Sequence, residues 1–471
     1  MSKFQTIALA LAIAAIVSTS GCASFQSRES AANLDGVIPA TWPLPVTTPV
    51  ADAALALPDI GWRDFFADAR LQDVVALALE NNRDLRVAML NVERARAQYR
   101  IQRADRVPSV GVNAQMERIG ADNPALESET YSVGLGLTAF ELDLFGRVRN
   151  LSQAALQQYL ATEASQRSAQ LSLVAEVAHL WLALAADRDQ LRIAEATLAT
   201  HEESLTLNQA RRELGAVSQL VLEQTRTQVA TARGDVARLS GQVQRDINAL
   251  NLLAGVTLDS GLLPEGLSED VVGLGKVPAA LPADVLLRRP DLIAAEHRLI
   301  AANANIAAAR AAFFPSIRLT GSFGTVSTEL SGLFESNTTM WSFIPQINIP
   351  IFQGGRLRAA LGMAEADRDI ALAQYEKAIQ NGFREVADAL ALSATLAEQV
   401  DASQALLDAA ANAERLAQAR HDAGLDSNLI RLDAQRTLYA AQQQMVAVRL
   451  AEQANRVSLY KVLGGGWIER N

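Results

Sequence analysis

Two kinds of sequence pattern occur along the chain, one typical of helices and one typical of strands. In the first, over residues 147–255, proline is absent and Ala, Leu, Gln, Glu and Arg dominate. These residues are strong helix formers, and proline would have interrupted the helix. We expect one helix over residues 147–213 and an antiparallel one over 219–253, with Gly215 capping the end of the first and Ser218 the start of the second. The first helix would be roughly 100 Å long, a distance that no compact domain requires.

The second pattern is a strict alternation of apolar and polar residues, which predicts β-strands with one apolar face. It occurs over residues 109–118, 131–139, 317–324 and 341–349. Each stretch has about the length of a strand that crosses a membrane. Aromatic residues, otherwise scarce, lie near the strand ends: Tyr131, Phe140, Phe313, Phe314, Trp341 and Phe343. A small soluble sheet with one wet face would alternate in the same way, so the pattern alone leaves both interpretations open.

Strands that span a membrane would require several copies of the chain. Four strands cannot close a barrel, and lipid does not tolerate unpaired strand edges. Two copies would supply about eight strands around an interior filled by side chains, whereas three would supply about twelve strands and a usable lumen. We therefore expect a homotrimer.

The whole plan occurs twice, at an offset of about 207 to 209 residues. The two copies predict an internal duplication rather than a solenoid. The second long hairpin is as free of proline as the first, since none follows Pro350. The matching residues include Asp84 and Asp291, Pro108 and Pro315, Arg147 and Arg356, Gly215 and Gly424, and Gly255 and Gly464.

The N-terminus has the features of an exported protein. Lys3 precedes an apolar run over residues 7–17, which suits a signal peptide and is too short for a transmembrane helix. The only cysteine, Cys22, follows, as in bacterial lipoproteins whose mature chain begins with a lipidated Cys. Thr19 departs from the Leu that this signal prefers, and ordinary cleavage beside an idle thiol is the alternative. Ala23 after the cysteine favours sorting to the outer membrane.

These features divide the chain into four parts. A lipoprotein signal peptide covers residues 1–21, and a lipid-anchored extended strap, rich in proline, covers 22–60. The first repeat covers 61–265 and the second 266–471. Each repeat is expected to hold a helix, a β-hairpin (109–140 and 316–350) and a long helical hairpin (147–255 and 356–463).

Composition argues against several classes of function. The net charge is −10 and there is no Lys/Arg run, so nucleic acid is not an expected partner. We find no Ser/His/Asp set, phosphate loop or clustered carboxylates, and therefore expect no enzyme. A lone cysteine excludes an intramolecular disulfide. The four histidines lack the spacing of metal ligands, and we expect them on helix surfaces and no metal site: His179, His201, His297 and His421.

Four segments carry a resemblance to a known family: ELDLFGR at 141–147, PIFQGGRL at 350–357, LDAQR at 432–436 and YKVLGGGW at 460–467. The chain resembles the TolC-like outer-membrane efflux channels, in their lipid-anchored NodT-type branch. The resemblance implies an α+β membrane protein in which a trimeric 12-stranded transmembrane β-barrel continues into a periplasmic α-helical barrel. It also implies a periplasmic adaptor and an inner-membrane pump as partners, and no cofactor besides the lipid on Cys22.

The implied function is that of a passive exit duct in the outer membrane, conducting drugs or other small molecules outward. The alternative is a structural periplasmic coiled-coil or adaptor protein without a pore. Five residues stand at the expected strand–helix corners: Gly146, Arg147, Gly354, Gly355 and Arg356. The backbone needs positive φ at the three glycines, and the two arginines then begin the long helices. The resemblance places adaptor-docking tips at the two helical turns: Gly215, Ala216, Val217, Ser218, Gly424, Leu425, Asp426 and Ser427.

Three residues just past the second turn are candidates for a periplasmic aperture. Leu429, Asp433 and Arg436 share one helix face. In a trimer they would form a ring of Leu, which can close by dewetting, and a ring of Asp, which attracts cations. Spacing alone favours a packed Leu beside a surface ion pair, but the resemblance places the family's constriction at Leu429 and Asp433 and thereby favours the aperture. Asn428 stands where some relatives carry an aromatic residue, so pore dimensions do not transfer.

Overall fold

The computed structural model describes residues 60–123, 126–268, 271 and 283–465. The signal peptide, Cys22 and almost all of the strap lie outside the described residues. Contacts divide the chain into two compact units, each of which draws on both repeats. Among described residues, unit 1 comprises 91–163 and 294–376, and unit 2 comprises 60–90, 164–293 and 377–465.

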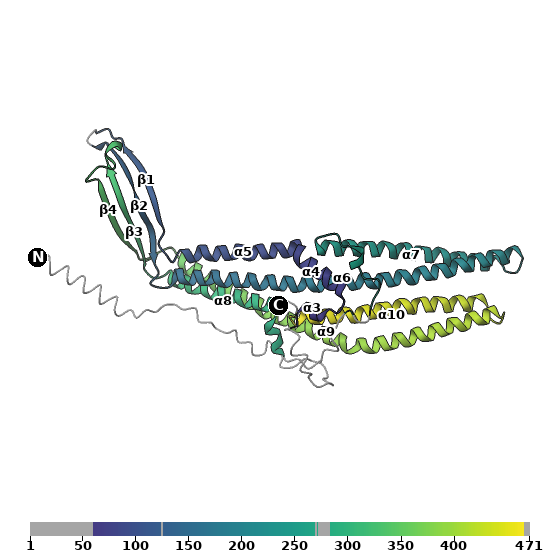
Figure 1. The fold of residues 1–471 in the computed structure, drawn as a ribbon. Helices are drawn as coiled ribbons and strands as arrows, with labels where there is room; N and C mark the ends of the chain where they lie inside the picture. Colours follow the sequence, from purple (N-terminus) through teal and green to yellow (C-terminus); the bar gives the residue numbers. More distant parts are fainter. Residues whose placement is uncertain (1–59, 124–125, 269–270, 272–282, 466–471) are drawn as a thin grey trace. The chain divides into compact units, whose positions relative to one another are not determined.

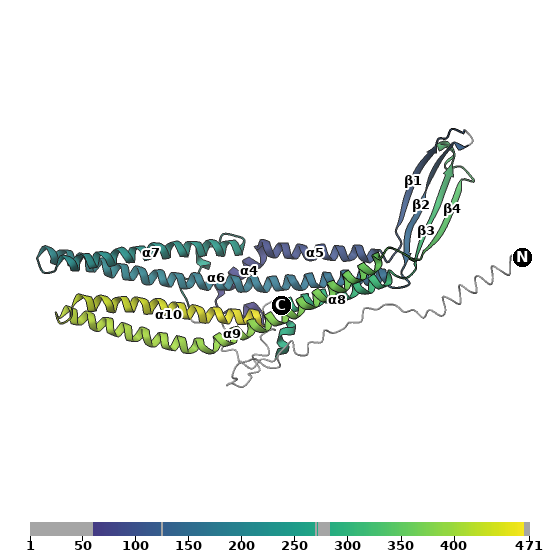
Figure 2. The same ribbon diagram turned by 180° about the vertical axis from the view of Figure 1, so that it is seen from behind.

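Each repeat contains one very long helix followed by a shorter returning helix (Figures 1 and 2). The first pair is α6 (Arg147–Glu213) and α7 (Gln219–Ala254), and the second is α9 (Arg356–Asp422) and α10 (Asn428–Val462). Both α6 and α9 are 67 residues long, which confirms the predicted rods. An 18-residue window of α6 is apolar enough to cross a membrane, but 61% of it is buried inside the protein, as is typical of a core helix.

Shorter helices precede the strands of each repeat. In the first they are α3 (Trp62–Phe65), α4 (Ala69–Asn81) and α5 (Arg83–Ala104), and in the second η4 (Ala283–Arg288) and α8 (Pro290–Ala311). The helical segment before the first hairpin is divided, because Asp68 begins a new helix by accepting hydrogen bonds from the backbone N–H groups of Arg70 and Leu71. Short 3₁₀ turns, η3 (Ser260–Leu262) and η5 (Leu330–Gly332), complete the described elements.

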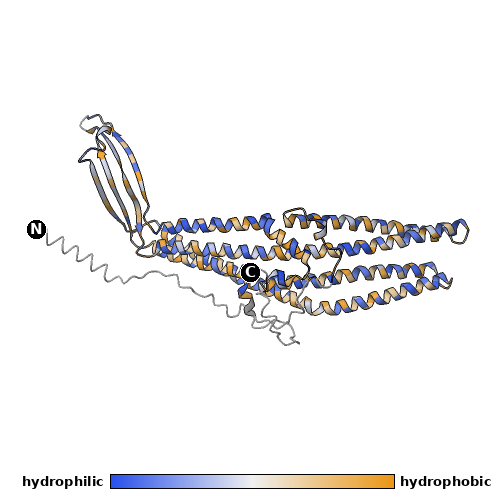
Figure 3. Cartoon of the chain, in the orientation of Figure 1, coloured by the Kyte–Doolittle hydropathy of each residue, from blue (hydrophilic) through white to orange (hydrophobic). Residues whose placement is uncertain are grey.

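The four predicted strands form one antiparallel sheet in the order β1-β2-β3-β4. Their bounds are Val110–Ile119, Ser128–Leu142, Ser316–Ser327 and Thr339–Asn348. The register aligns the apolar positions of all four strands on one face, as in the row that joins Val112, Leu135, Phe323 and Trp341. Figure 3 shows the alternation of hydropathy along the strands. The sheet therefore has one apolar and one polar face.

A β-bulge in β2 keeps the apolar face continuous. The β2–β3 register shifts between Leu137 and Phe140, and Ala139 has a φ of 49°. The Ala139 N–H donates to Thr320 Oγ1 at 3.2 Å. Because of the extra residue, Phe140 lies on the same face as Leu137, whereas a regular strand would have turned it to the polar face.

No core covers the apolar face of the sheet among the described residues. Every residue of β1 is exposed, and Val112 and Trp341 are each 72% exposed. A soluble sheet of this size would bury one face against helices. The outer edges of β1 and β4 also have no partner strand in the described chain. The sheet is therefore incomplete by itself.

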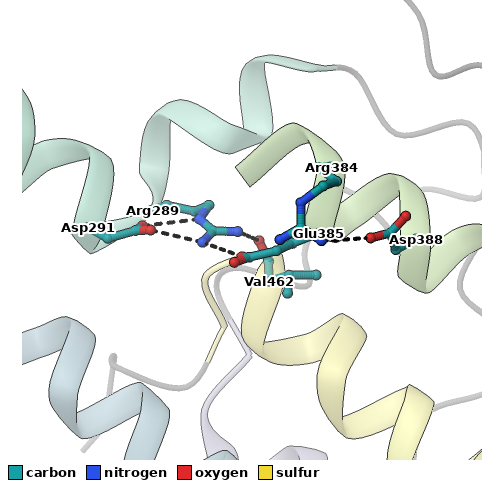
Figure 4. A network of polar contacts seen from close by, with 6 residues as sticks. All are labelled: Arg289, Asp291, Arg384, Glu385, Asp388 and Val462. Atoms are coloured by element: carbon teal, nitrogen blue, oxygen red, sulfur yellow. Dashed lines mark hydrogen bonds and ion pairs between the residues drawn. The ribbon is translucent and has the colours of Figure 1, made fainter. Parts of the chain in front are cut away.

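In unit 2, the end of each returning helix is tied to the residue directly before a shorter helix of its own repeat, α5 or α8. Asn82 Nδ2 donates to the carbonyl oxygen of Leu253 at 2.9 Å, and Arg289 Nη1 donates to that of Val462 at 3.0 Å. Arg289 also bonds to Asp291 at 2.9 Å and to Glu385 at 2.8 Å (Figure 4). The duplication thus repeats a contact, with a different donor in each copy.

The two helices of the first hairpin carry facing carboxyl groups. Asp246 of α7 is 7% exposed and accepts a hydrogen bond from Gln242 Nε2 at 2.8 Å, but its Oδ2 atom has no donor among described residues. Burial and the neighbouring Asp246 carboxylate raise the pKa of Asp187, on α6, to about 6, against the influence of Arg238. At the matching positions of the second hairpin, 209 residues further along, stand Leu396 and Asn455.

We predict that Arg289→Met lowers the free energy of unfolding by about 2 kcal/mol. Breaking a buried pair costs about 3–5 kcal/mol, and the value is lower here because the Asp291 and Glu385 side chains are 40% and 38% exposed. The matched control is Arg384→Met, which removes an ion pair with Asp388 whose side chains are 64% and 66% exposed, and should cost less than about 0.5 kcal/mol. Thermal unfolding followed by circular dichroism compares the two; equal losses would contradict the role of Arg289.

We predict a pH-dependent advantage for Asp246→Asn. The raised pKa of Asp187, about 6, means that the folded protein binds more protons than the unfolded chain. The contribution of this pair to the free energy of unfolding is therefore fully present below about pH 4, and it is lost as the pH rises through about 6. Above that pH the variant, which removes the repulsion, should be more stable than wild type by about 1–2 kcal/mol after allowance for partial solvent exposure. Thermal unfolding of both proteins at about pH 5 and pH 8 measures the difference, and a difference independent of pH would refute the pairing.

Candidate functional site

The candidate aperture residues lie together on an exposed face at the start of α10. Leu429 is 67% exposed, so the alternative in which it packs inside its hairpin does not describe this structure. Arg436 Nη2 donates to Asp433 Oδ1, and the two side chains are 81% and 61% exposed. An exposed pair of this kind contributes less than about 1 kcal/mol. The charged groups of Asp433 and Arg436 therefore face solvent, where they can interact with a solute that passes this face.

The opposite face of the same turn is buried around an arginine that the sequence analysis missed. Arg431 is 6% exposed, and its Nε and Nη2 atoms donate to Asn428 Oδ1 at 3.2 and 2.9 Å. Burial lowers the pKa of Arg431, while the carboxylates of Asp422 and Glu414 oppose that effect. Asn428 thus holds a buried cation beside Leu429. An Arg between two apolar positions of an amphipathic helix was the only signal for it.

The two candidate tips are built by the same turn. At the first, Gly215 has a φ of 71°, and Ala216 N–H donates to the Arg211 carbonyl at 2.8 Å. At the second, Gly424 has a φ of 74°, and Leu425 N–H donates to the Arg420 carbonyl at 2.8 Å. These bonds are typical of a Schellman motif. Each tip presents an exposed leucine: Leu214 at 84% and Leu425 at 68%.

The tips differ in how their second helix begins. Ser218 Oγ accepts a hydrogen bond from Val221 N–H at 3.4 Å, as expected of an N-cap, whereas the Ser427 side chain makes no capping bond. The second tip is held instead by Arg420, which donates to Asp426 at 2.7 and 3.0 Å and thereby lowers the pKa of that carboxyl. Nothing in the local sequence pattern had indicated this ion pair.

At the strand–helix corners, three glycines have the positive φ that was predicted: Gly146 at 79°, Gly354 at 55° and Gly355 at 87°. Arg147 donates to both carboxylate oxygens of Glu141 at 2.8 Å, which fixes the start of α6 to the end of β2. In the second repeat Asn348 stands at the position that matches Glu141, and Arg356 donates to Gln353 instead. Both arginines line one cavity of about 330 Å³.

We expected the four histidines on helix surfaces, but none of them is fully exposed. All four are partly buried, and burial lowers the pKa of His179, His201 and His297. Within the described ranges, no three His, Cys, Asp or Glu side chains are grouped so that they could hold a metal ion. The arrangement therefore offers exposed tips, an exposed charged face and an apolar sheet.

Comparisons with known proteins agree with this arrangement. The model of the family "Outer membrane efflux protein" matches residues 74–256 and 281–465, one segment in each repeat. Two relatives from Pseudomonas putida, the antibiotic efflux pump outer membrane protein ArpC and the toluene efflux pump outer membrane protein TtgC, are each 44% identical over 471 residues. Each alignment covers 98% of this chain and 96% of the relative.

A solved structure has the same fold. The open state of the MtrE outer membrane channel from Neisseria gonorrhoeae matches with a TM-score of 0.83 and 40% identity, over 91% of this chain and 98% of that one. The α+β fold of long helical hairpins and a membrane sheet is thus that of a TolC-like channel, and efflux through the outer membrane is its function. The chain belongs to the outer membrane efflux protein family.

Proposed function

We propose that three copies of this chain close a 12-stranded barrel in the outer membrane and together form the exit duct of a tripartite efflux pump. The observation that carries the proposal is the four-stranded sheet, whose apolar face and two outer edges have no partner in the described chain. Lipid satisfies the apolar face, but only another strand satisfies the edges. Pairing β4 of one copy with β1 of the next leaves no edge.

The polar face of the sheet then lines the lumen. It carries Asn113, Gln115, Arg318, Thr320 and Gln346, which alternate with the lipid-facing residues. Twelve strands enclose an aqueous channel, whereas about eight would be filled by side chains. Small polar and charged side chains keep such a channel wet.

The rods continue the duct on the periplasmic side. At about 1.5 Å per residue, helices of 67 residues reach roughly 100 Å. Leu214 and Leu425 at the tips give a periplasmic adaptor apolar anchors beside the charged pair of Arg420 and Asp426. An adaptor docked there would connect the duct to an inner-membrane pump.

The duct is passive and takes its cargo from the pump, so we assign it no catalytic step. The names of the two Pseudomonas relatives point to antibiotics and toluene, and we propose small apolar organic molecules of this kind as the cargo. The alternative function, a periplasmic coiled-coil or adaptor protein without a pore, would account for the hairpins. It would not explain the exposed apolar face of the sheet.

The aperture of the duct is proposed at Leu429, Asp433 and Arg436. Three copies place three exposed leucines and three ion pairs around one axis. The leucine ring limits the passage of water, and the carboxylates favour cations over anions. The buried Arg431 lies on the opposite face of the same helical turn and stabilises it through its hydrogen bonds to Asn428.

We predict that Asp433→Ala raises the ion conductance of the purified trimer severalfold and reduces its preference for cations. The substitution removes three carboxylates, frees three arginines and shortens the side chains at the constriction. Wild-type protein in detergent should first give the mass of three chains. Conductance and reversal potential in planar bilayers then compare the two proteins.

The matched control is Glu223→Ala, because Glu223 and Arg226 make an i,i+3 pair of the same kind on α7. It should leave both quantities as in wild type. Unchanged conductance and selectivity in Asp433→Ala would remove the aperture from this position. A monodisperse monomer would end the proposal of a duct.

We further propose that Cys22 carries a covalent lipid that holds the strap on the outer membrane. Each buried CH₂ of an acyl chain contributes about 0.8 kcal/mol of membrane affinity. Cys22→Ser should abolish incorporation of a labelled fatty acid in cells, because the serine hydroxyl cannot replace the thiol as the acyl acceptor. Ser24→Ala, two residues further on, should retain the label. Label that persists on Cys22→Ser would show that the anchor lies elsewhere.

A further inference from the structure

A cavity in unit 2 opens between the first hairpin and α10. Its volume is about 590 Å³, and its walls come from α6, α7 and α10, which lie side by side in Figures 1 and 2. Pockets of about 300–1,000 Å³ hold drug-sized molecules. The walls include Ala194, Ala232, Leu429 and Leu432, so part of the surface is apolar.

Three polar atoms on the same walls lack hydrogen bonds. They are His201 Nδ1 on α6, Gln228 Oε1 on α7 and Gln435 Oε1 on α10, each of them buried. None has a partner in the part of the chain that the structure describes. Buried polar atoms are nearly always paired, because an unpaired one is costly. Their gathering around one cavity therefore points to a molecule that supplies hydrogen-bond donors.

The charges on the walls favour a cation. Asp235 and Asp433 both line the cavity, whereas Arg436 is the one arginine among its lining residues. Arg436 is paired with Asp433, and Arg238, which is not among the lining residues, is paired with Asp235 at 3.2 Å. Tyr439 also donates to Asp235, at 3.4 Å. Burial and the nearby Arg431 lower the pKa of His201, which keeps its imidazole neutral and able to accept at one nitrogen.

We propose that this cavity binds a small amphipathic ammonium ion. The N–H groups of the ligand donate to Gln228, Gln435 and His201, and its apolar body packs against Leu432 and the alanines. Its charge lies beside Asp235, whose carboxylate it shares with Arg238. The ligand would contact α6 and α7 of the first repeat and α10 of the second, and would thereby tie the two hairpins together. This site does not depend on the proposed trimer or on the direction of transport.

The first test compares three indole compounds that differ only in the side-chain head group. Tryptamine carries a primary ammonium with N–H donors, N,N,N-trimethyltryptammonium has the charge without donors, and tryptophol has a donor without the charge. Isothermal titration of the full-length protein in lipid nanodiscs, corrected with empty nanodiscs, should give one site per chain for tryptamine. The other two compounds should bind at least tenfold more weakly.

The second test uses variants of the wall. Gln228→Leu and Gln435→Leu remove an acceptor while keeping the side-chain size. Each should weaken tryptamine binding at least tenfold and raise the melting temperature of the unliganded protein, because an unpaired buried oxygen is lost. Gln244→Leu, on an exposed face of α7, is the matched control and should leave the affinity unchanged.

Two outcomes overturn the proposal. One is the absence of saturable tryptamine binding up to millimolar concentration in the wild-type protein. The other is equal binding of tryptamine and its trimethyl derivative, which would show that charge and apolar contact suffice without the three acceptors. A loss of affinity in Gln244→Leu as large as in the wall variants would likewise place the ligand elsewhere.

Discussion

The unpaired edges of β1 and β4 are the constraint on which the rest of the architecture depends. A strand edge in lipid must be paired, and the described part of this chain has two such edges and four strands. Any solution must join the edge of one copy to that of the next around an axis. The long helices follow the strands directly, so the same axis applies to them. Exposed faces on the long helices are then a consequence of the sheet.

The two repeats keep the positions of their contacting residues more closely than the types of those residues. Asn82 and Arg289 reach the same carbonyl position in each repeat, one as a neutral amide and the other as a charged group with two carboxylate partners. The Asp187 and Asp246 pair of the first hairpin becomes Leu396 and Asn455 in the second. Two halves that must pack against each other in a ring cannot stay identical, because each meets a different neighbour. The divergence therefore removes the pair of carboxyl groups from the second hairpin.

Features that depend on local sequence could be predicted, and those that depend on distant residues could not. The ends of α6 follow from Gly146, where only a residue that tolerates positive φ turns the strand into the helix, and from Gly215. The alternation of Val110 to Met116 fixes the apolar face of β1. The bulge at Ala139 depends on Thr320 in another strand, and the burial of Arg431 depends on the neighbouring hairpin. Neither the bulge nor the burial produces a periodic pattern in the sequence of its own segment.

The candidate aperture residues also line the cavity between α10 and the first hairpin. Within the first hairpin, α6 and α7 are joined by a buried bond from Asn208 to Thr225 and an ion pair between Glu202 and Arg233. Between α10 and that hairpin lies a cavity of about 590 Å³ rather than close packing. Packed cores resist continuous deformation, whereas a hollow boundary lets one element move as a whole. Leu429 and Asp433 line that hollow, so any motion that widens the aperture also changes the volume of the cavity, and a molecule that fills the cavity opposes it.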